Sequence, residues 1–113
     1  MEKTYINKFY IKGAVIFTIS PEYNRQSPKL AKLVQAIFQN PLSQFGVSVR
    51  SDSRYYDDEN QNAVHYISLY FECGALGMPN IYRLNSVLNG LKLISENLPA
   101  FEEVKFHVPN QEF

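Results

Sequence analysis

The spacing of apolar residues along this chain changes in the order strand, helix, strand, strand, helix, strand. Strands place apolar side chains at every second residue, whereas amphipathic helices place them three or four residues apart. One helix after the first strand and another after the third are typical of a split βαβ sandwich. In that arrangement two helices cover one face of a four-stranded antiparallel sheet. The sequence therefore predicts an α+β fold of the ferredoxin-like type.

Four segments have the composition of strands, and they cover residues 5–20, 45–56, 63–73 and 103–108. An acidic, amide-rich stretch joins the second segment to the third, so these two are predicted to form a hairpin with a solvated tip. Lys12 and Gly13 interrupt the first segment. Residues 5–12 are therefore expected either as an extra N-terminal strand or as one end of a strand that bends at a glycine bulge.

Two segments have helical spacing. Ser27 is placed to cap the first helix, Pro28 suits its first turn, and Pro41 is expected to stop it. The second helix is predicted to open at Pro79, and Gly90 inside it suggests close packing against the sheet. The inward positions of all segments predict one core, made of Phe17, Leu33, Ile37, Leu69, Phe71, Leu84, Leu88, Leu91 and Phe106.

The length and the charge balance limit the size and the partners of the fold. A chain of 113 residues has room for one core, so residues 1–113 are expected to form a single domain. Hydrophobic residues make up 45% of the chain, which is enough to fold around that core. The 11 basic and 11 acidic residues cancel, so no overall field attracts a polyanion.

Cysteine use and hydropathy predict a cytoplasmic location. Cys73 is the only cysteine, so it has no partner for an internal disulfide, and no long apolar secretory core follows the first residues. The longest apolar stretch, residues 14–17, is far below the roughly 18 residues that a membrane-spanning helix needs. We therefore expect no membrane insertion.

No set of residues with catalytic or metal-binding spacing stands out. Cys73 and His65 lie on one predicted strand eight residues apart, which is roughly 26 Å at about 3.3 Å per residue. His107 points to the other face of the sheet. The two histidines, the cysteine and the acidic hairpin tip lack the ligand spacing of zinc or calcium sites. The sequence thus predicts a protein that is not an enzyme, with no cofactor and no metal.

Two surfaces combine aromatic side chains with charge, which is the composition of protein-binding hot spots. The first is the sheet face away from the helices, and the second is the hairpin tip. The candidate residues are Arg50, Tyr66 and Tyr70 on the sheet face and Tyr55, Tyr56, Asp57, Asp58 and Glu59 at the tip. The alternative for the sheet face is that residues 1–12 or a second copy of the chain in a homodimer simply cover it.

Three functions remain open at this point. The first is a small protein-binding inhibitor, analogous to bacterial immunity proteins, antitoxins and phage-encoded anti-defence proteins, whose partner would be a toxin, a nuclease or a subunit of a defence complex. The second is a single-stranded nucleic-acid or RNA binder that stacks bases on Tyr66 and Tyr70. The third is a dimeric enzyme with His107 or Tyr66 as its acid or base, although no residue is seen to orient either group.

Overall fold

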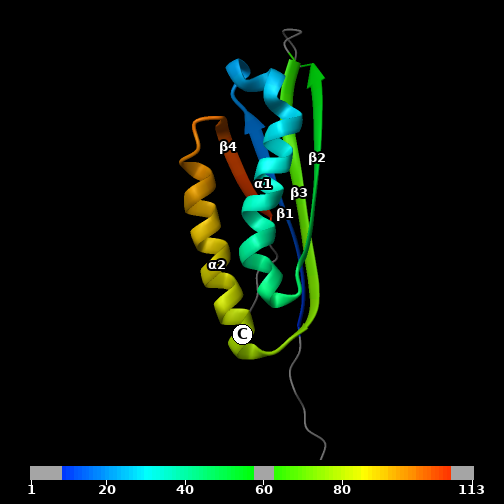
Figure 1. Ribbon diagram of the computed structural model, residues 1–113, viewed down its shortest axis with the longest axis vertical. Helices are drawn as coiled ribbons and strands as arrows, with labels where there is room; N and C mark the ends of the chain where they lie inside the picture. Colours follow the sequence, from blue (N-terminus) through cyan, green and yellow to red (C-terminus); the bar gives the residue numbers. More distant parts are fainter. Residues whose placement is uncertain (1–8, 58–62, 108–113) are drawn as a thin grey trace, which may run out of the picture.

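The computed structural model describes residues 9–57 and 63–107, which form an α+β fold with two helices and a four-stranded antiparallel sheet (Figure 1). The strands are β1 (Phe9–Ile19), β2 (Ser48–Asp57), β3 (Ala63–Leu76) and β4 (Phe101–His107). The helices are α1 (Ser27–Leu42) and α2 (Met78–Glu96). The strand order is β2-β3-β1-β4, so β2 and β4 are the edges.

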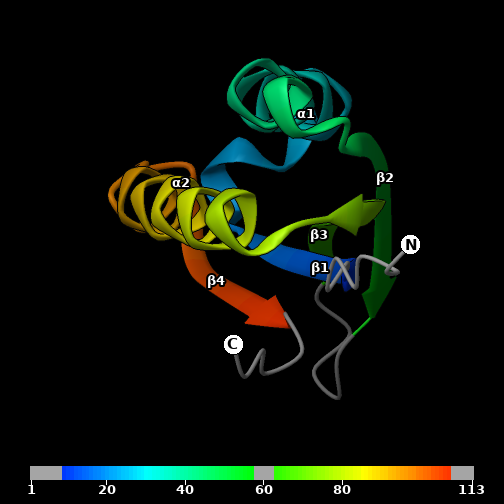
Figure 2. The same cartoon turned by 90° about the horizontal axis from the view of Figure 1, so that it is seen from below.

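Both helices lie on the same side of the sheet (Figure 2). α1 packs on β2 and β3, and α2 packs on β4. Burial alternates along β1, where Val15, Phe17 and Ile19 point toward the helices and are almost completely buried. Within the described residues no helix lies on the other face of the sheet, and we refer to it as the open face. Alternation along each strand therefore decides which side chains enter the core and which remain on the open face.

The core is held together by aromatic contacts that join the sheet to α1. The Phe17 ring packs edge-on against Phe38 with their centroids 6.0 Å apart, and against Phe101 at 4.8 Å. Phe106 on β4 contacts Phe38 at 6.0 Å. Edge-to-face and tilted pairs at these distances are favoured by the ring quadrupoles. Phe17 on the central strand thus links α1 to the edge strand β4.

The ends of α1 differ from the prediction. Ser27 is the first residue of the helix rather than its cap, because a 3-10 helix (Pro21–Gln26) runs directly into it. Pro41 does not stop the helix, which continues to Leu42. Leu42 is fully buried and Phe45 nearly so, and burial of each side chain contributes roughly 1.5–3 kcal/mol. That gain offsets the roughly 3 kcal/mol cost of a proline inside a helix.

The bounds of the strands also differ from the prediction by two or three residues. A second 3-10 helix (Ser43–Phe45) and Gly46, whose φ is 71°, come before β2, so this strand begins later than residue 45. β3 extends three residues further than predicted, to Leu76, and β4 begins earlier, at Phe101.

Most of the predicted core is confirmed, with one error. Leu33 is 48% exposed, although its spacing on α1 matches the core pattern. The buried stripe of α1 is centred on Leu30, Val34 and Phe38, and Leu33 lies at its margin, beyond the surface that the sheet covers. Ile37 and Phe106 are half-buried against the core, and the other predicted members are buried. An apolar stripe wider than its contact surface leaves its outer members in water.

Gly13 neither breaks β1 nor marks a bulge. β1 is one strand from Phe9 to Ile19, and its register shifts lie between Phe9 and Ile11 against β3 and between Thr18 and Ile19 against β4. Gly13 is opposite Phe71, and a β-carbon there would lie 2.7 Å from the ring atom Cζ of Phe71. The glycine is therefore required by a close approach of the phenylalanine ring. The proposed extra strand includes residues 5–8, which lie outside the described residues.

Leu88 and Leu33 differ in burial, so their alanine variants should differ in stability. Leu88 is 5% exposed, so Leu88→Ala should lower the free energy of unfolding by about 2–5 kcal/mol through lost burial and a cavity. Leu33→Ala should cost about 1 kcal/mol or less because half of that side chain is already in water. Urea denaturation followed by circular dichroism measures both, and equal losses would contradict the burial pattern.

Replacement by alanine should change the stability in opposite directions at Gly13 of β1 and Gly90 of α2. Gly13→Ala should destabilise the fold by roughly 1–3 kcal/mol, because the buried Phe71 ring has little space to move. Gly90 is exposed and nothing lies within 4 Å of a β-carbon there. The prediction that it packs closely against the sheet is therefore wrong. Gly90→Ala should stabilise the protein by about 0.5–1 kcal/mol through helix propensity. Thermal melts of the two variants test the opposite signs.

Candidate functional site: the open face of the sheet

The open face is built from the outward-pointing residues of all four strands. In register, Arg50 lies beside Tyr70, Lys12 beside Glu72, and Ile16 beside both Ser68 and Lys105. The residues that define the open face are Lys12, Ala14, Ile16 and Thr18 of β1, Ser48, Arg50, Asp52, Arg54 and Tyr56 of β2, Tyr66, Ser68, Tyr70 and Glu72 of β3, and Glu103, Lys105 and His107 of β4.

Arg50 and Tyr70 form the best-defined contact on this face. The Arg50 guanidinium carbon lies 4.8 Å from the centroid of the Tyr70 ring, which is within cation–π range. The two residues are direct neighbours across β2 and β3, so the sheet register itself places the cation over the ring. The Tyr70 side chain remains 38% exposed. The pair therefore offers a flat aromatic and a guanidinium together to solvent.

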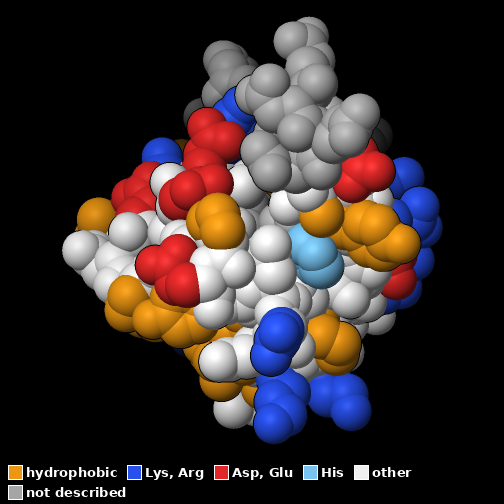
Figure 3. Space-filling model, turned by 90° about the horizontal axis from the view of Figure 1, so that it is seen from above, with side chains coloured by type: hydrophobic (Ala, Val, Ile, Leu, Met, Phe, Trp, Pro, Cys, Tyr) orange, Lys and Arg blue, Asp and Glu red, His pale blue; other side chains and the backbone are white. Residues whose placement is uncertain are grey.

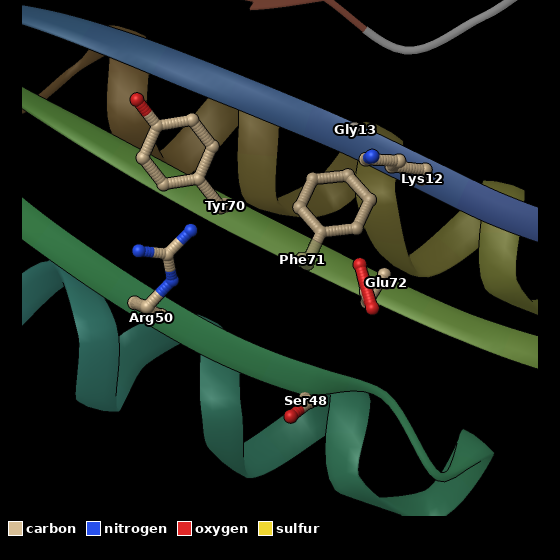
Figure 4. Close-up of a pocket in the computed structure, with 7 residues that line it drawn as sticks. All are labelled: Lys12, Gly13, Ser48, Arg50, Tyr70, Phe71 and Glu72. Atoms are coloured by element: carbon tan, nitrogen blue, oxygen red, sulfur yellow. The ribbon is translucent and has the colours of Figure 1, made fainter.

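A groove of about 330 Å³ lies next to this pair (Figure 4). Lys12, Ser48 and Glu72 line it together with Arg50, Tyr70, Gly13 and Phe71. Figure 4 shows Tyr70 and Arg50 turned toward one another and Phe71 beside Gly13. The short side chain of Ser48 leaves space between the larger residues, and the strands at Gly13 and Phe71 contribute to the lining. Two cations and one carboxylate therefore surround an aromatic surface.

The upper part of the open face carries a second aromatic pair. The rings of Tyr56 and Tyr66 lie 5.8 Å apart and tilted. Ser68 between Tyr66 and Tyr70 is only 5% exposed, so the tyrosines cover the centre of the sheet. This places the predicted residues Arg50, Tyr66, Tyr70 and Tyr56 on one surface.

Charges on the open face are mixed, and several are paired locally. Arg54 and Asp52 approach to 3.7 Å, as do Lys105 and Glu103, in each case two residues apart on one strand. Exposed pairs of this kind contribute little to stability. They do reduce the net positive field that a phosphate backbone would need.

Other exposed cations lie on the helix side. Arg25, Lys29 and Lys32 occupy the 3-10 helix and the first turns of α1. Seen from above, lysine and arginine side chains lie at more than one edge of this end of the molecule (Figure 3). The sheet separates Arg25, Lys29 and Lys32 from Tyr66 and Tyr70, which are the stacking groups of the open face.

The predicted hairpin-tip surface is divided by the structure. Tyr55 points to the helix side and stacks on His65 at 5.3 Å, whereas Tyr56 is on the open face. Adjacent strand residues face opposite ways, so the two tyrosines do not form one patch. Asp57 is exposed, and Asp58 and Glu59 lie outside the described residues.

The sequence reading missed a polar contact between α1 and β3. The Ser27 hydroxyl donates to the carbonyl oxygen of Asn24 at 2.7 Å and lies 3.1 Å from Nδ1 of His65. The hydroxyl has one proton, so while Ser27 donates it to Asn24, the Nδ1–H tautomer of His65 is the donor to Ser27. Residues 38 positions apart give no sequence signal for such a pair.

This hydrogen-bond direction is opposite to that of a serine nucleophile, whose proton must pass to the imidazole. The side-chain oxygen of Asn24 is buried without a hydrogen-bond partner nearby, within the described part of the chain. The cluster holds the start of α1 against β3.

Among residues 9–57 and 63–107 no group of three metal-ligating side chains is found, and no helix there is long and apolar enough to cross a membrane. His65 and Cys73 lie on the same strand, as predicted, and His107 is on the open face beside Ala14. The predicted inertness of Cys73 stays a prediction.

No known protein-family model matches this sequence, and no curated protein matches it significantly. The side chains described above are therefore the basis for a proposed function.

The direction of the Ser27 hydrogen bond predicts that Ser27 does not act as a nucleophile. Incubation with a fluorophosphonate probe should leave the intact mass of the protein unchanged, because the serine proton is held by the Asn24 carbonyl. A covalent adduct on Ser27 that disappears in His65→Ala would contradict this assignment.

Proposed function

We propose that this chain is a small, non-enzymatic protein-binding module that inhibits its partner through the open face. The observation that carries the proposal is the Arg50–Tyr70 pair, with its 4.8 Å cation–π contact beside a groove of about 330 Å³. Tyrosine and arginine are the residues most enriched in binding hot spots. The proposed partner is a bacterial toxin, a nuclease or a subunit of a defence complex, which the protein binds in the cytoplasm.

The mixed charge of the open face supports a protein partner over a nucleic acid. Lys12 and Arg50 lie beside Glu72, and Arg54 is paired with Asp52. A surface with both signs is complementary to another protein surface of the opposite pattern, which favours specificity. A single-stranded nucleic acid needs a cationic track along the stacking aromatics. The exposed cations of α1 are on the other side of the sheet.

We further propose that the fold is the ferredoxin-like split βαβ sandwich. The strand order β2-β3-β1-β4 with antiparallel neighbours supports this, as does the placement of both helices on one face. In this topology β1 and β3 are the central strands. The central strand β3 then supplies Tyr66 and Tyr70, while β2 supplies the cations at the rim.

The role of the open face is tested by removing its two central tyrosines. Tyr66→Ala combined with Tyr70→Ala should leave the fold intact and weaken partner binding by roughly thirtyfold or more, the loss expected for hot-spot anchors. Tyr82→Ala is the matched control, because Tyr82 is an exposed tyrosine on α2. Affinity capture from the source cells identifies the partner, and titration of the purified partner gives the affinities and the inhibition.

Equal binding by the double variant and the control would contradict the proposal. Tight binding to single-stranded oligonucleotides, falling steeply with salt and with loss of the two tyrosines, would replace it with the nucleic-acid function.

A further inference from the structure

The edge strand β2 is capped along only half of its length. On its free side, Gln39 accepts a hydrogen bond from the Val49 N–H at 3.3 Å and donates to the Val47 carbonyl at 3.2 Å. Gln35 donates to the Val49 carbonyl at 3.4 Å. These two side chains occupy main-chain groups that would otherwise pair with another strand. The lower part of the edge is thereby protected.

The glutamine side chains of α1 reach the main chain of Val47 and Val49 but not the upper part of β2, which begins at Ser51. Gln39 and Gln35 lie on one row of α1, four residues apart, and the next residue on that row is Ala31, which has no amide. Both main-chain groups of Val49 point to the free side, so those of Ser51, Ser53 and Tyr55 do so too.

Within the described residues no hydrogen bond reaches these upper main-chain groups on the free side. Ser53 is exposed, and Tyr55 is 68% exposed. The segment also contains no proline and no lysine, which are the usual protections of an edge strand. The upper half of β2 is therefore available for strand addition.

We propose that this upper half of β2 pairs with the same segment of a second copy of the chain, antiparallel and centred on Ser53. This surface borders the Arg50–Tyr70 groove, but the inference does not depend on the proposed function. Ser53 then lies opposite Ser53 of the second copy, and Ser51 lies opposite Tyr55 of the second copy. The three pairs with outward main-chain groups form the hydrogen-bonded ladder.

The charges of β2 favour this register over the two neighbouring ones. Centred on Ser53, Asp52 lies opposite Arg54 of the second copy, and Arg50 lies opposite Tyr56 of the second copy. Opposite charges and cation–π pairs across strands are favourable. A centre on Asp52 would place two carboxylates together, and a centre on Arg54 would place two guanidinium groups together. Both alternatives are disfavoured, because like charges directly opposite each other repel.

Self-pairing of this kind joins two sheets into one of eight strands. The open faces of both copies then lie on the same side and become continuous. The existing Arg54–Asp52 contact within one strand is 3.7 Å long and exposed, so exchanging it for contacts between copies costs little.

Sedimentation velocity from about 1 μM to about 1 mM, the range in which weak association is measurable, tests the register through its charges. The chain should form dimers, and Asp52→Arg should raise their dissociation constant by about tenfold or more, since two repulsive pairs replace two attractive ones. The double variant Asp52→Arg with Arg54→Asp restores opposite charges and should dimerise like the original protein. A chain that stays monomeric throughout, or a double variant no better than the single one, would overturn the proposal.

A disulfide trap tests the centre independently. In a Cys73→Ser background, Ser53→Cys should cross-link two copies on mild oxidation, because a hydrogen-bonded pair holds its Cα atoms about 5.5 Å apart, within the range for a disulfide. Ser48→Cys is the control, since its two copies would be ten positions out of register, or roughly 33 Å apart. Cross-linking at residue 48 but not at residue 53 would show a different interface.

Discussion

Burial of the sheet on one face only is the constraint from which the rest of this structure follows. Both connections that contain a helix return the chain on the same side, so α1 and α2 share one core centred on Phe17 and Phe38. Neither of the two described helices covers the opposite face. Its centre is shielded by its own side chains around Ser68, which is 5% exposed and lies between Tyr66 and Tyr70 on β3. Such a face is simultaneously structural and available for contact.

The register of β2 on β3 decides which side chains lie next to each other on the open face. Because Arg50 is directly opposite Tyr70, the guanidinium covers the ring without any loop to position it. Gly13 on the next strand accommodates the Phe71 ring on the helix side, and both residues line the groove beside that pair. Sites on strands are held more rigidly than sites on loops.

The sequence predicted features that depend on local periodicity. The order of elements and the faces of Tyr66, Tyr70 and Arg50 follow from alternation along strands, which needs no tertiary information. The assignment of Leu33 to the core failed because periodicity gives the direction of an apolar stripe but not the width of the surface it meets. Pro41 predicts the end of α1 because a proline inside a helix is locally unfavourable. The free energy gained by burying Leu42 depends on tertiary packing, which the local sequence does not show.

Contacts between distant segments left no local pattern to detect. The Ser27–His65 hydrogen bond and the capping of Val49 by Gln35 and Gln39 join residues that approach only in the folded chain. The hairpin tip was predicted as one surface, yet Tyr55 and Tyr56 face opposite sides. Alternation along β2 already predicts that neighbouring tyrosines point to opposite faces, whereas the composition of the tip does not.

The central claim is that this protein contacts its partner through the open face. It is tested most directly by site-specific photo-cross-linking in the source cells. A benzophenone amino acid is placed at Tyr70 on the open face or at Tyr82 on α2, both of which are exposed. The account predicts a cross-linked partner protein from position 70 and none from position 82. A specific adduct from position 82 with none from position 70 would contradict it.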